Sequence, residues 1–155
     1  MTSKFHIQIR SGELKEDNRK RIHSITNPTN SHQPEIKIQL PVAYKGPNVN
    51  SEEIYYTPEH YYVAAISGCF FTTFSVVSSM SNFSYISLEI QAIGYMKEIE
   101  DEKIMDKIKQ TITLTISSSK YEKKARKLLE ITENRCPLVK SVKTRIENTY
   151  EILTK

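Results

Sequence analysis

The sequence predicts an α+β protein in which helices pack on a largely antiparallel sheet. Three observations carry this prediction. Segments in which apolar and polar residues alternate, as is typical of strands, occur in both halves of the chain. A stretch without a charged residue runs from Tyr61 to Leu88, and an amphipathic helix is predicted over residues 120–134.

The N-terminal part predicts three strands, over residues 5–10, 21–26 and 35–40. The third is the clearest, because apolar and polar residues alternate along it without a break. A loop with two prolines separates it from the second strand. Residues 41–56 are then expected to form a long connection to the central helix.

The central helix is predicted to begin at Thr57 and to end near Asn82. Thr57 can cap the helix, Pro58 suits its first position, and Glu59 places a negative charge at the positive end of the helix dipole. Its length and lack of charge are compatible with a membrane span. Many serines and threonines oppose that interpretation, so we expect a helix buried in a protein core and no membrane partner.

The second half predicts strands over residues 86–95, 108–116 and 142–152. Gln110 interrupts the apolar face of the middle strand. Residues 97–106 are interpreted as a charged connection.

Ser119 and Glu122 predict a capping box at the start of the second helix. The Cys136-Pro137 pair is expected to end that helix.

Composition limits the class of protein. The chain has 155 residues, 38% of them hydrophobic and 26% charged, which is ordinary for a single globular domain spanning residues 1–155. This composition excludes a disordered chain, a collagen-like repeat and a disulfide scaffold.

The net charge of +4 raises the question of whether the protein binds nucleic acid. The basic run over residues 15–21 is either a solvated loop or a phosphate-binding patch. No nucleic-acid-binding motif accompanies it, so we expect no nucleic-acid partner.

The N-terminus lacks the apolar core of a signal peptide, which predicts a cytoplasmic protein. The two cysteines, Cys69 and Cys136, are therefore expected to be free, reactive or transiently bonded. The four histidines are scattered, and no zinc-ligand spacing occurs, so no metal site is expected.

Three residues are candidates for chemistry. Cys69 lies inside the uncharged helix and is either a small buried hydrophobic residue or a reactive thiol; its neighbour Gly68 suggests a close approach of backbone or ligand. Cys136 lies at a helix C-terminus, where a thiolate is not stabilised, so it suits a resolving role better than a primary nucleophile. Glu59 lies ten residues before Cys69, about 15 Å along one helix, so the two would meet only across an antiparallel dimer.

Two segments carry a resemblance. Residues 57–69 have the sequence TPEHYYVAAISGC, and residues 128–137 have the sequence LLEITENRCP. The combination of Pro-Glu at the start of a long helix, a small-residue run ending in cysteine, and a later helix ending in Cys-Pro resembles the OsmC/Ohr family. This family comprises osmotically induced protein C and the organic hydroperoxide resistance proteins. The order of elements matches over nearly the whole chain. The segment after the second cysteine, residues 137–141, is closer to the broad OsmC-like branch than to the branch best fitted to organic peroxides.

The resemblance implies an OsmC-like fold and an intertwined homodimer whose central helices pack in the middle. It also implies a cysteine-based reductase of organic hydroperoxides, active against oxidative stress without metal, haem or another bound cofactor. Carried over, Cys69 is the peroxidatic cysteine and Cys136 is the resolving cysteine. A Cys69 sulfenic acid would condense with Cys136 to a disulfide, which an external dithiol reductant of lipoyl or thioredoxin type would reduce.

The resemblance further implies that Glu59 orients an arginine near the thiolate. Arg21 is the first candidate, and Arg19 and Arg10 are the alternatives. Five aromatic residues are expected to line a pocket for fatty or aromatic peroxides: Tyr55, Tyr56, Tyr61, Phe70 and Phe71. The alternative function is a dimeric OsmC-like domain that binds a small ligand with little or no peroxidase turnover.

Overall fold

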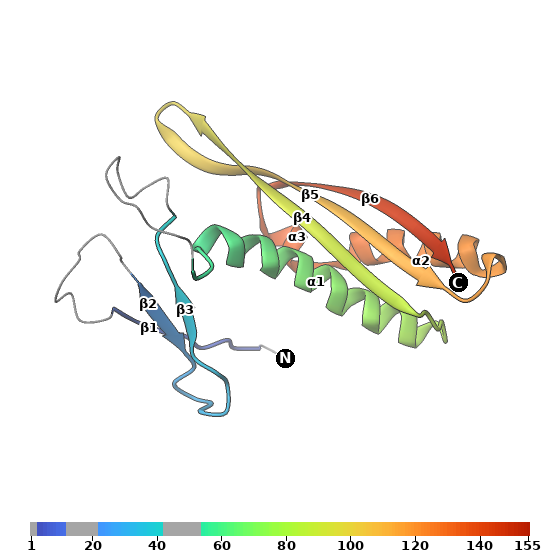
Figure 1. The fold of residues 1–155 in the computed structure, drawn as a ribbon, viewed down its shortest axis with the longest axis horizontal. Coiled ribbons are helices and arrows are strands. Elements are labelled where there is room, and N and C mark those ends of the chain that lie inside the picture. The colour runs from blue at the N-terminus through green and yellow to red at the C-terminus, as the bar shows by residue number, and fades with distance from the viewer. Residues whose placement is uncertain (1–2, 12–21, 42–53) are drawn as a thin grey trace. The chain divides into compact units, whose positions relative to one another are not determined.

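The computed structural model describes residues 3–11, 22–41 and 54–155 (Figure 1). The chain divides into two compact units, Met1–Tyr61 and Tyr62–Lys155, and each is described by itself. Three strands, a long helix, two strands, a second long helix and a last strand follow one another in the predicted order. The α+β class is therefore confirmed, and the single domain over residues 1–155 stays a prediction.

The first unit contains an antiparallel sheet in the order β1-β2-β3. The strands β1 (Gln8–Ser11), β2 (His23–Thr26) and β3 (Ile36–Ile38) are shorter than predicted. Beyond β3, the buried Gln39 fixes the approach to the central helix. Its side-chain oxygen accepts hydrogen bonds from the backbone N–H groups of Ile54 and Tyr55, at 3.1 and 3.0 Å.

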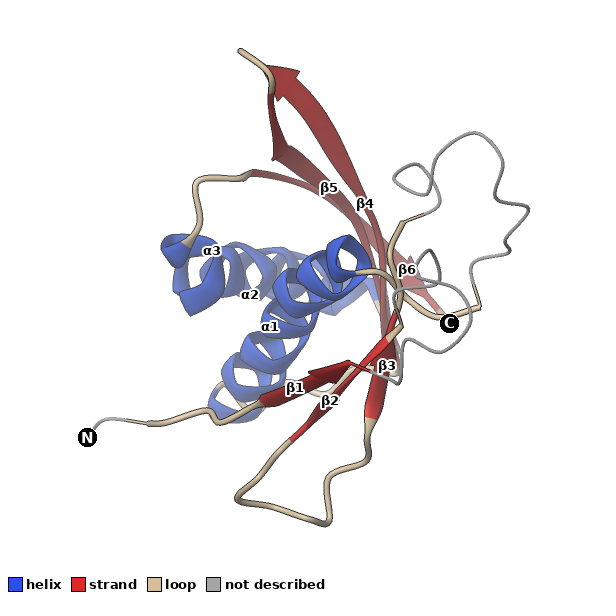
Figure 2. Ribbon diagram, turned by 90° about the vertical axis from the view of Figure 1, so that its left-hand side faces the viewer, coloured by secondary structure: helices blue, strands red, loops and turns tan. Residues whose placement is uncertain are grey.

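The second unit is built on a sheet in the order β4-β5-β6. Strand β5 pairs antiparallel with β4 and parallel with β6. Figure 2 shows that the helices of this unit lie on one face of the sheet. Its elements, with α1 beginning in the first unit, are α1 (Pro58–Met80), β4 (Ser87–Ile99), β5 (Glu102–Ile116), η2 (Ser119–Tyr121), α2 (Glu122–Arg135), α3 (Pro137–Ser141) and β6 (Arg145–Thr154).

The core of the second unit lies between the helices and the sheet. The predicted apolar face of β5 is confirmed, because its four apolar residues from Ile108 to Ile116 are fully buried, and Gln110 is buried with them. Burial of such side chains stabilises the fold by roughly 1.5–3 kcal/mol each. The main cluster consists of Phe70, Phe74, Val77, Phe83, Ile112, Leu114, Ile116, Ala125, Leu128 and Leu129.

The predicted charged connection over residues 97–106 was wrong. Strands β4 and β5 continue through it as a hairpin, with Ile99 paired to Glu102. Glu100 and Asp101 form the turn, and their φ angles are positive, at 51° and 66°. Positive φ angles are favoured in two-residue hairpin turns. Charged residues are accommodated because β6 pairs with β5 only from Lys107 onward, so the tip is two-stranded and solvated on both faces.

The predicted capping box of Ser119 and Glu122 was also wrong. Residues 119–121 form the 3-10 turn η2, and neither η2 nor α2 has a side-chain cap. The Glu122 carboxylate instead lies 3.4 Å from Arg126, one turn along the exposed side of α2. The predicted end of the helix at Cys136-Pro137 is confirmed.

Helix α1 has one buried face and one exposed face in the single chain. Ile66, Phe70, Phe74 and Val77 face the core. By length and composition α1 is able to cross a membrane: its mean hydropathy over an 18-residue window is 1.6, and 28% of that window is buried. Its hydroxyl groups bond back to the helix, as Ser67 does to the carbonyl of Val63 and Thr72 to that of Gly68.

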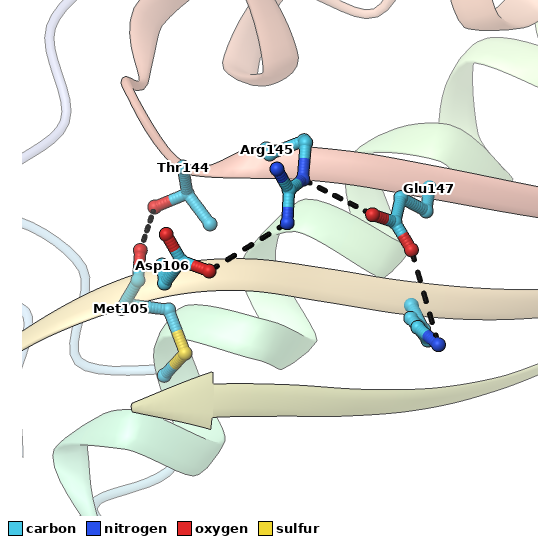
Figure 3. A network of polar contacts seen from close by, with 6 residues as sticks. Met105, Asp106, Thr144, Arg145 and Glu147 are labelled. Atoms are coloured by element: carbon cyan, nitrogen blue, oxygen red, sulfur yellow. Dashed lines mark hydrogen bonds and ion pairs between the residues drawn. The ribbon is translucent and has the colours of Figure 1, made fainter. Parts of the chain in front are cut away.

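A polar network fixes the start of β6 (Figure 3). The Thr144 hydroxyl donates to the carbonyl of Met105 at 2.9 Å. Because that hydroxyl has only one proton, the Tyr62 hydroxyl, 2.8 Å away, donates to Thr144. Arg145 lies 3.7 Å from Asp106 and 3.0 Å from Glu147. These side chains are exposed enough that the ion pairs add little stability. The Tyr62–Thr144 contact links α1 to the residue that precedes β6.

Gly94 on β4 is required by the packing of α1. A Cβ atom at this position would lie 2.6 Å from Val63 Cγ2 and 2.8 Å from Met105 Sδ. We therefore expect Gly94→Ala to lower the free energy of unfolding by about 1–3 kcal/mol, as overpacked cores do. Urea denaturation measures this, and adding Val63→Ala should recover part of the loss. A single variant as stable as the parent chain would contradict the packing described.

Candidate thiol site

Cys69 is presented by the middle of α1. Its neighbour Phe70 is fully buried in the core, whereas Gly68 on the other side is exposed. Cys69 itself is half-buried and free. Within the described residues, no atom lies within 4 Å of a Cβ built on Gly68, so the expected close approach at this glycine is not seen among them.

Cys136 lies at the junction of α2 and α3. Its N–H bonds the carbonyl of Thr132 at 3.0 Å and so completes the last turn of α2. Because Pro137 disfavours a helical conformation in the residue before it, Cys136 adopts φ −64° and ψ 112°. Pro137 then begins α3. The resulting bend places the Cys136 side chain inside the protein, where its exposed fraction is 0%.

The two cysteines meet although 67 residues separate them in the sequence. The Cys136 thiol donates to Cys69 Sγ, and the two sulfur atoms are 2.8 Å apart. A disulfide requires about 2.05 Å between the sulfurs, so only a small side-chain movement is needed to bond them. One thiol of the pair is accessible from outside and the other is enclosed.

Burial raises the pKa of the Cys136 thiol above its ordinary value, and the hydrogen bond to Cys69 raises that pKa further. The backbone N–H groups of Val139 and Leu138 act in the opposite direction, with smaller effect. Cys136 therefore keeps its proton at neutral pH and acts as the hydrogen-bond donor of the pair.

A line of hydrogen-bonded polar side chains runs from the buried Gln110 through three half-buried residues to α2, and the sequence did not predict it. Gln110 Nε2 donates to Asn148 Oδ1 at 2.8 Å, and Asn148 Nδ2 donates to the Tyr150 hydroxyl at 3.4 Å. That hydroxyl donates to Glu133 Oε2 at 2.5 Å. The available signal was Gln110, a polar residue at an apolar position of a predicted strand.

Glu59 lies in the first turn of α1, in the first unit. Its Oε2 atom is buried without a hydrogen-bond partner in the part of the chain that the structure describes. Of the three arginine candidates, Arg10 is exposed on β1 opposite Ser24. Arg19 and Arg21 lie outside the described residues, as does the basic run over residues 15–21.

Aromatic residues of the first unit line a cleft of about 790 Å³. Tyr55, Tyr56 and Tyr61 belong to it, together with His60 and Lys37, and their role in a peroxide pocket stays a prediction. Tyr56 packs edge-on against Tyr61, and the Tyr61 hydroxyl donates to the carbonyl of Lys37 at 3.3 Å.

The other two predicted pocket residues behave differently. Phe70 is fully buried in the core against Tyr150, so its assignment to an open pocket was wrong. Phe71 is 45% exposed, and it is not among the residues that line the cleft.

Fold and site together define a small α+β protein that holds a pair of free cysteines between two helices on one face of a sheet. The family model described as OsmC-like protein matches residues 50–151. The chain therefore belongs to the OsmC-like protein family. No curated protein matches it.

Solved structures of this family share the fold. An OsmC-like protein of unknown function from Vibrio cholerae superposes with a TM-score of 0.77 at 18% identity, covering 96% of this chain and 99% of that chain. An organic hydroperoxide resistance protein from Elizabethkingia anophelis gives 0.65 at 16% identity, with all of both chains covered. The organic hydroperoxide resistance protein OhrB of Bacillus subtilis gives 0.57 at 18%, with 96% and 98% covered. At these identities the likeness is one of fold.

The raised pKa of Cys136 predicts how the pair reacts with an aromatic disulfide reagent such as dithiobis(nitrobenzoate). Attack by Cys69 releases one thionitrobenzoate and leaves a mixed disulfide, and attack by the Cys136 thiolate on Cys69 Sγ then releases the second. Because Cys136 is mostly protonated, the rate of the second phase should rise roughly tenfold per pH unit between about pH 7 and 9. Stopped-flow absorbance measures both phases. Cys136→Ser is the control and should lack the second phase, whereas a pH-independent second phase would contradict the assignment.

Proposed function

We propose that this protein is a cysteine-based peroxidase that reduces organic hydroperoxides to alcohols. The single observation that carries the proposal is the cysteine pair itself, with Cys69 accessible, Cys136 enclosed and their sulfurs 2.8 Å apart. A peroxide reaches Cys69 first, and the enclosed thiol is already at the distance needed to trap the oxidised product. The likeness of fold to organic hydroperoxide resistance proteins supports this choice of substrate.

The reaction proceeds in three steps. The Cys69 thiolate attacks the terminal peroxide oxygen, the O–O bond breaks, and the alcohol leaves after taking up a proton. The Cys136 thiol then gives up its proton as its sulfur attacks the sulfur of the Cys69 sulfenic acid. The S–S bond forms, the S–O bond breaks, and the hydroxyl group leaves with that proton as water. An external dithiol of lipoyl or thioredoxin type reduces the disulfide and becomes oxidised in turn. No bound cofactor is required.

We assign Glu59 to the orientation of an arginine that stabilises the Cys69 thiolate. Glu59 Oε2 is buried and has no hydrogen-bond partner among the described residues, which supports this assignment, because a buried carboxylate oxygen favours a cationic partner. Arg21 is the first candidate, followed by Arg19 and Arg10. The reaction is proposed to take place in the cytoplasm, where dithiol reductants are available.

The proposed active form is a homodimer. The outward face of α1 is small or apolar and uncovered in the single chain, consisting of Ala64, Ala65, Gly68, Phe71, Thr72 and Val76. In the first unit, Ile7 and Ile9 are also exposed, by 65% and 57%. Surfaces of this kind favour a second copy of the chain over solvent.

One observation favours the alternative function, a domain that binds a small ligand with little turnover. The cleft of the first unit combines three tyrosines with Lys37 and has the volume of a small-molecule site. Saturable ligand binding that persists in Cys69→Ser, without peroxide consumption by the parent protein, would establish this alternative.

Cysteine variants test the peroxidase. We expect Cys69→Ser to reduce consumption of cumene hydroperoxide to the background rate of the added dithiol, because the nucleophile is lost. Cys136→Ser should consume about one equivalent and then stop, because its sulfenic acid has no intramolecular partner. A ferrous-oxidation assay for residual peroxide measures both. Sustained turnover by either variant would contradict the role assigned to the cysteine that the variant lacks.

Gly68→Leu tests the dimer. No atom of the described residues lies within 4 Å of a Cβ added at Gly68, and leucine favours a helix over glycine by roughly 0.8 kcal/mol. The variant should therefore fold but dissociate to the monomer mass of 17.9 kDa. Light scattering after gel filtration measures the mass. Lys127→Leu, at an exposed position of α2, is the control. The proposal fails if Gly68→Leu remains dimeric.

A further inference from the structure

Tyr150 on β6 contacts both helices that carry the cysteines. Its ring packs against Phe70, the residue that follows Cys69, with the ring centroids 6.3 Å apart. Its hydroxyl donates to Glu133 on α2, three residues before Cys136. The Tyr150 side chain therefore links two helices. It contacts α1 at the residue next to the accessible thiol, and it contacts α2 one turn before the enclosed thiol. No step of the proposed reaction uses Tyr150 or Glu133.

The Tyr150 hydroxyl donates a hydrogen bond to Glu133 Oε2. Tyr150 is half-buried, and burial, followed by the neighbouring Glu133, raises the pKa of its hydroxyl above the ordinary value. The hydroxyl therefore keeps its proton and remains a donor at neutral pH. A hydrogen bond from a hydroxyl to a carboxylate is stronger than one between neutral groups. It therefore restrains the last turn of α2 against the sheet.

The amides behind Tyr150 orient it. Gln110 donates to Asn148, and Asn148 donates to the Tyr150 oxygen, so every proton in the line points toward Glu133. Within the described residues, Gln110 Oε1 is buried without a hydrogen-bond partner. A buried hydrogen-bond acceptor without a partner is unfavourable in a core. A polar network that is retained despite this unfavourable group is compatible with a role beyond filling space.

We propose that Tyr150 and Glu133 are positioning residues for disulfide formation, because their hydrogen bond holds the end of α2 where the Cys136 thiol meets Cys69. This inference rests on the proposed function, in that the disulfide between Cys69 and Cys136 is taken as the working step. The two residues raise the effective concentration of one thiol toward the other. They do not touch the peroxide.

The experiment is the equilibrium of the reduced protein with glutathione under anaerobic conditions. The protein dithiol and one glutathione disulfide yield the protein disulfide and two glutathiones, so the equilibrium constant measures the effective thiol concentration. Acid quenching, maleimide labelling and mass spectrometry give the oxidised fraction. We expect Tyr150→Phe and Glu133→Ala to lower the constant roughly tenfold, as loss of a hydrogen bond to a charged group should.

Two further variants separate positioning from general stability. Glu133→Gln keeps an acceptor for the Tyr150 hydroxyl and should retain the parent constant within about threefold. Arg126→Ala removes only the exposed pair with Glu122 on the same helix and should leave the constant unchanged. Tyr150→Phe keeps the aromatic ring that packs against Phe70. Urea denaturation of each reduced variant measures its stability.

The proposal is overturned if Tyr150→Phe lowers the denaturation midpoint while its glutathione constant stays that of the parent chain, because that result assigns the network to stability alone. Should Tyr150→Phe not fold, the comparison of Glu133→Ala with Glu133→Gln decides, and equal constants for these two overturn the proposal. Because no peroxide is present, an inactive peroxidase would not change either result. The two proposals therefore fail separately.

Discussion

The parallel pairing of β5 with β6 is the constraint on which the cysteine pair depends. Parallel neighbours cannot be joined by a tight turn, so the chain must cross over between them. Here α2 and α3 form the crossover, on the face of the sheet that α1 also covers (Figure 2). Cys136 lies at the junction of these two helices, and the crossover therefore carries it to the helix that bears Cys69.

Local sequence rules then determine how far each thiol is buried. Pro137 bends the chain at Cys136 and turns its side chain inward, where burial raises the pKa of the thiol. Cys69 lies between an exposed glycine and a buried phenylalanine, so it faces the boundary of the core. One accessible thiol and one enclosed, protonated thiol suit the two-step oxidation that we propose for this pair.

The sequence predicted the elements better than their limits. Apolar alternation located β5 correctly, because a strand buried on one face leaves a strong pattern. It failed over residues 97–106, because a solvated hairpin tip places no apolar requirement on either face. The meeting of Cys69 and Cys136 followed only from the family resemblance, since no spacing rule joins residues so far apart. Tyr150 was missed because its role depends on contacts with two other elements.

A peroxide is expected to convert this cysteine pair to a disulfide. The intact mass of the fully reduced protein, measured after one equivalent of cumene hydroperoxide, tests this directly. We expect prompt loss of two hydrogen atoms per chain, with a peptide cross-link between Cys69 and Cys136. Unchanged mass with both thiols still free would contradict it and would leave the OsmC-like fold without this chemistry.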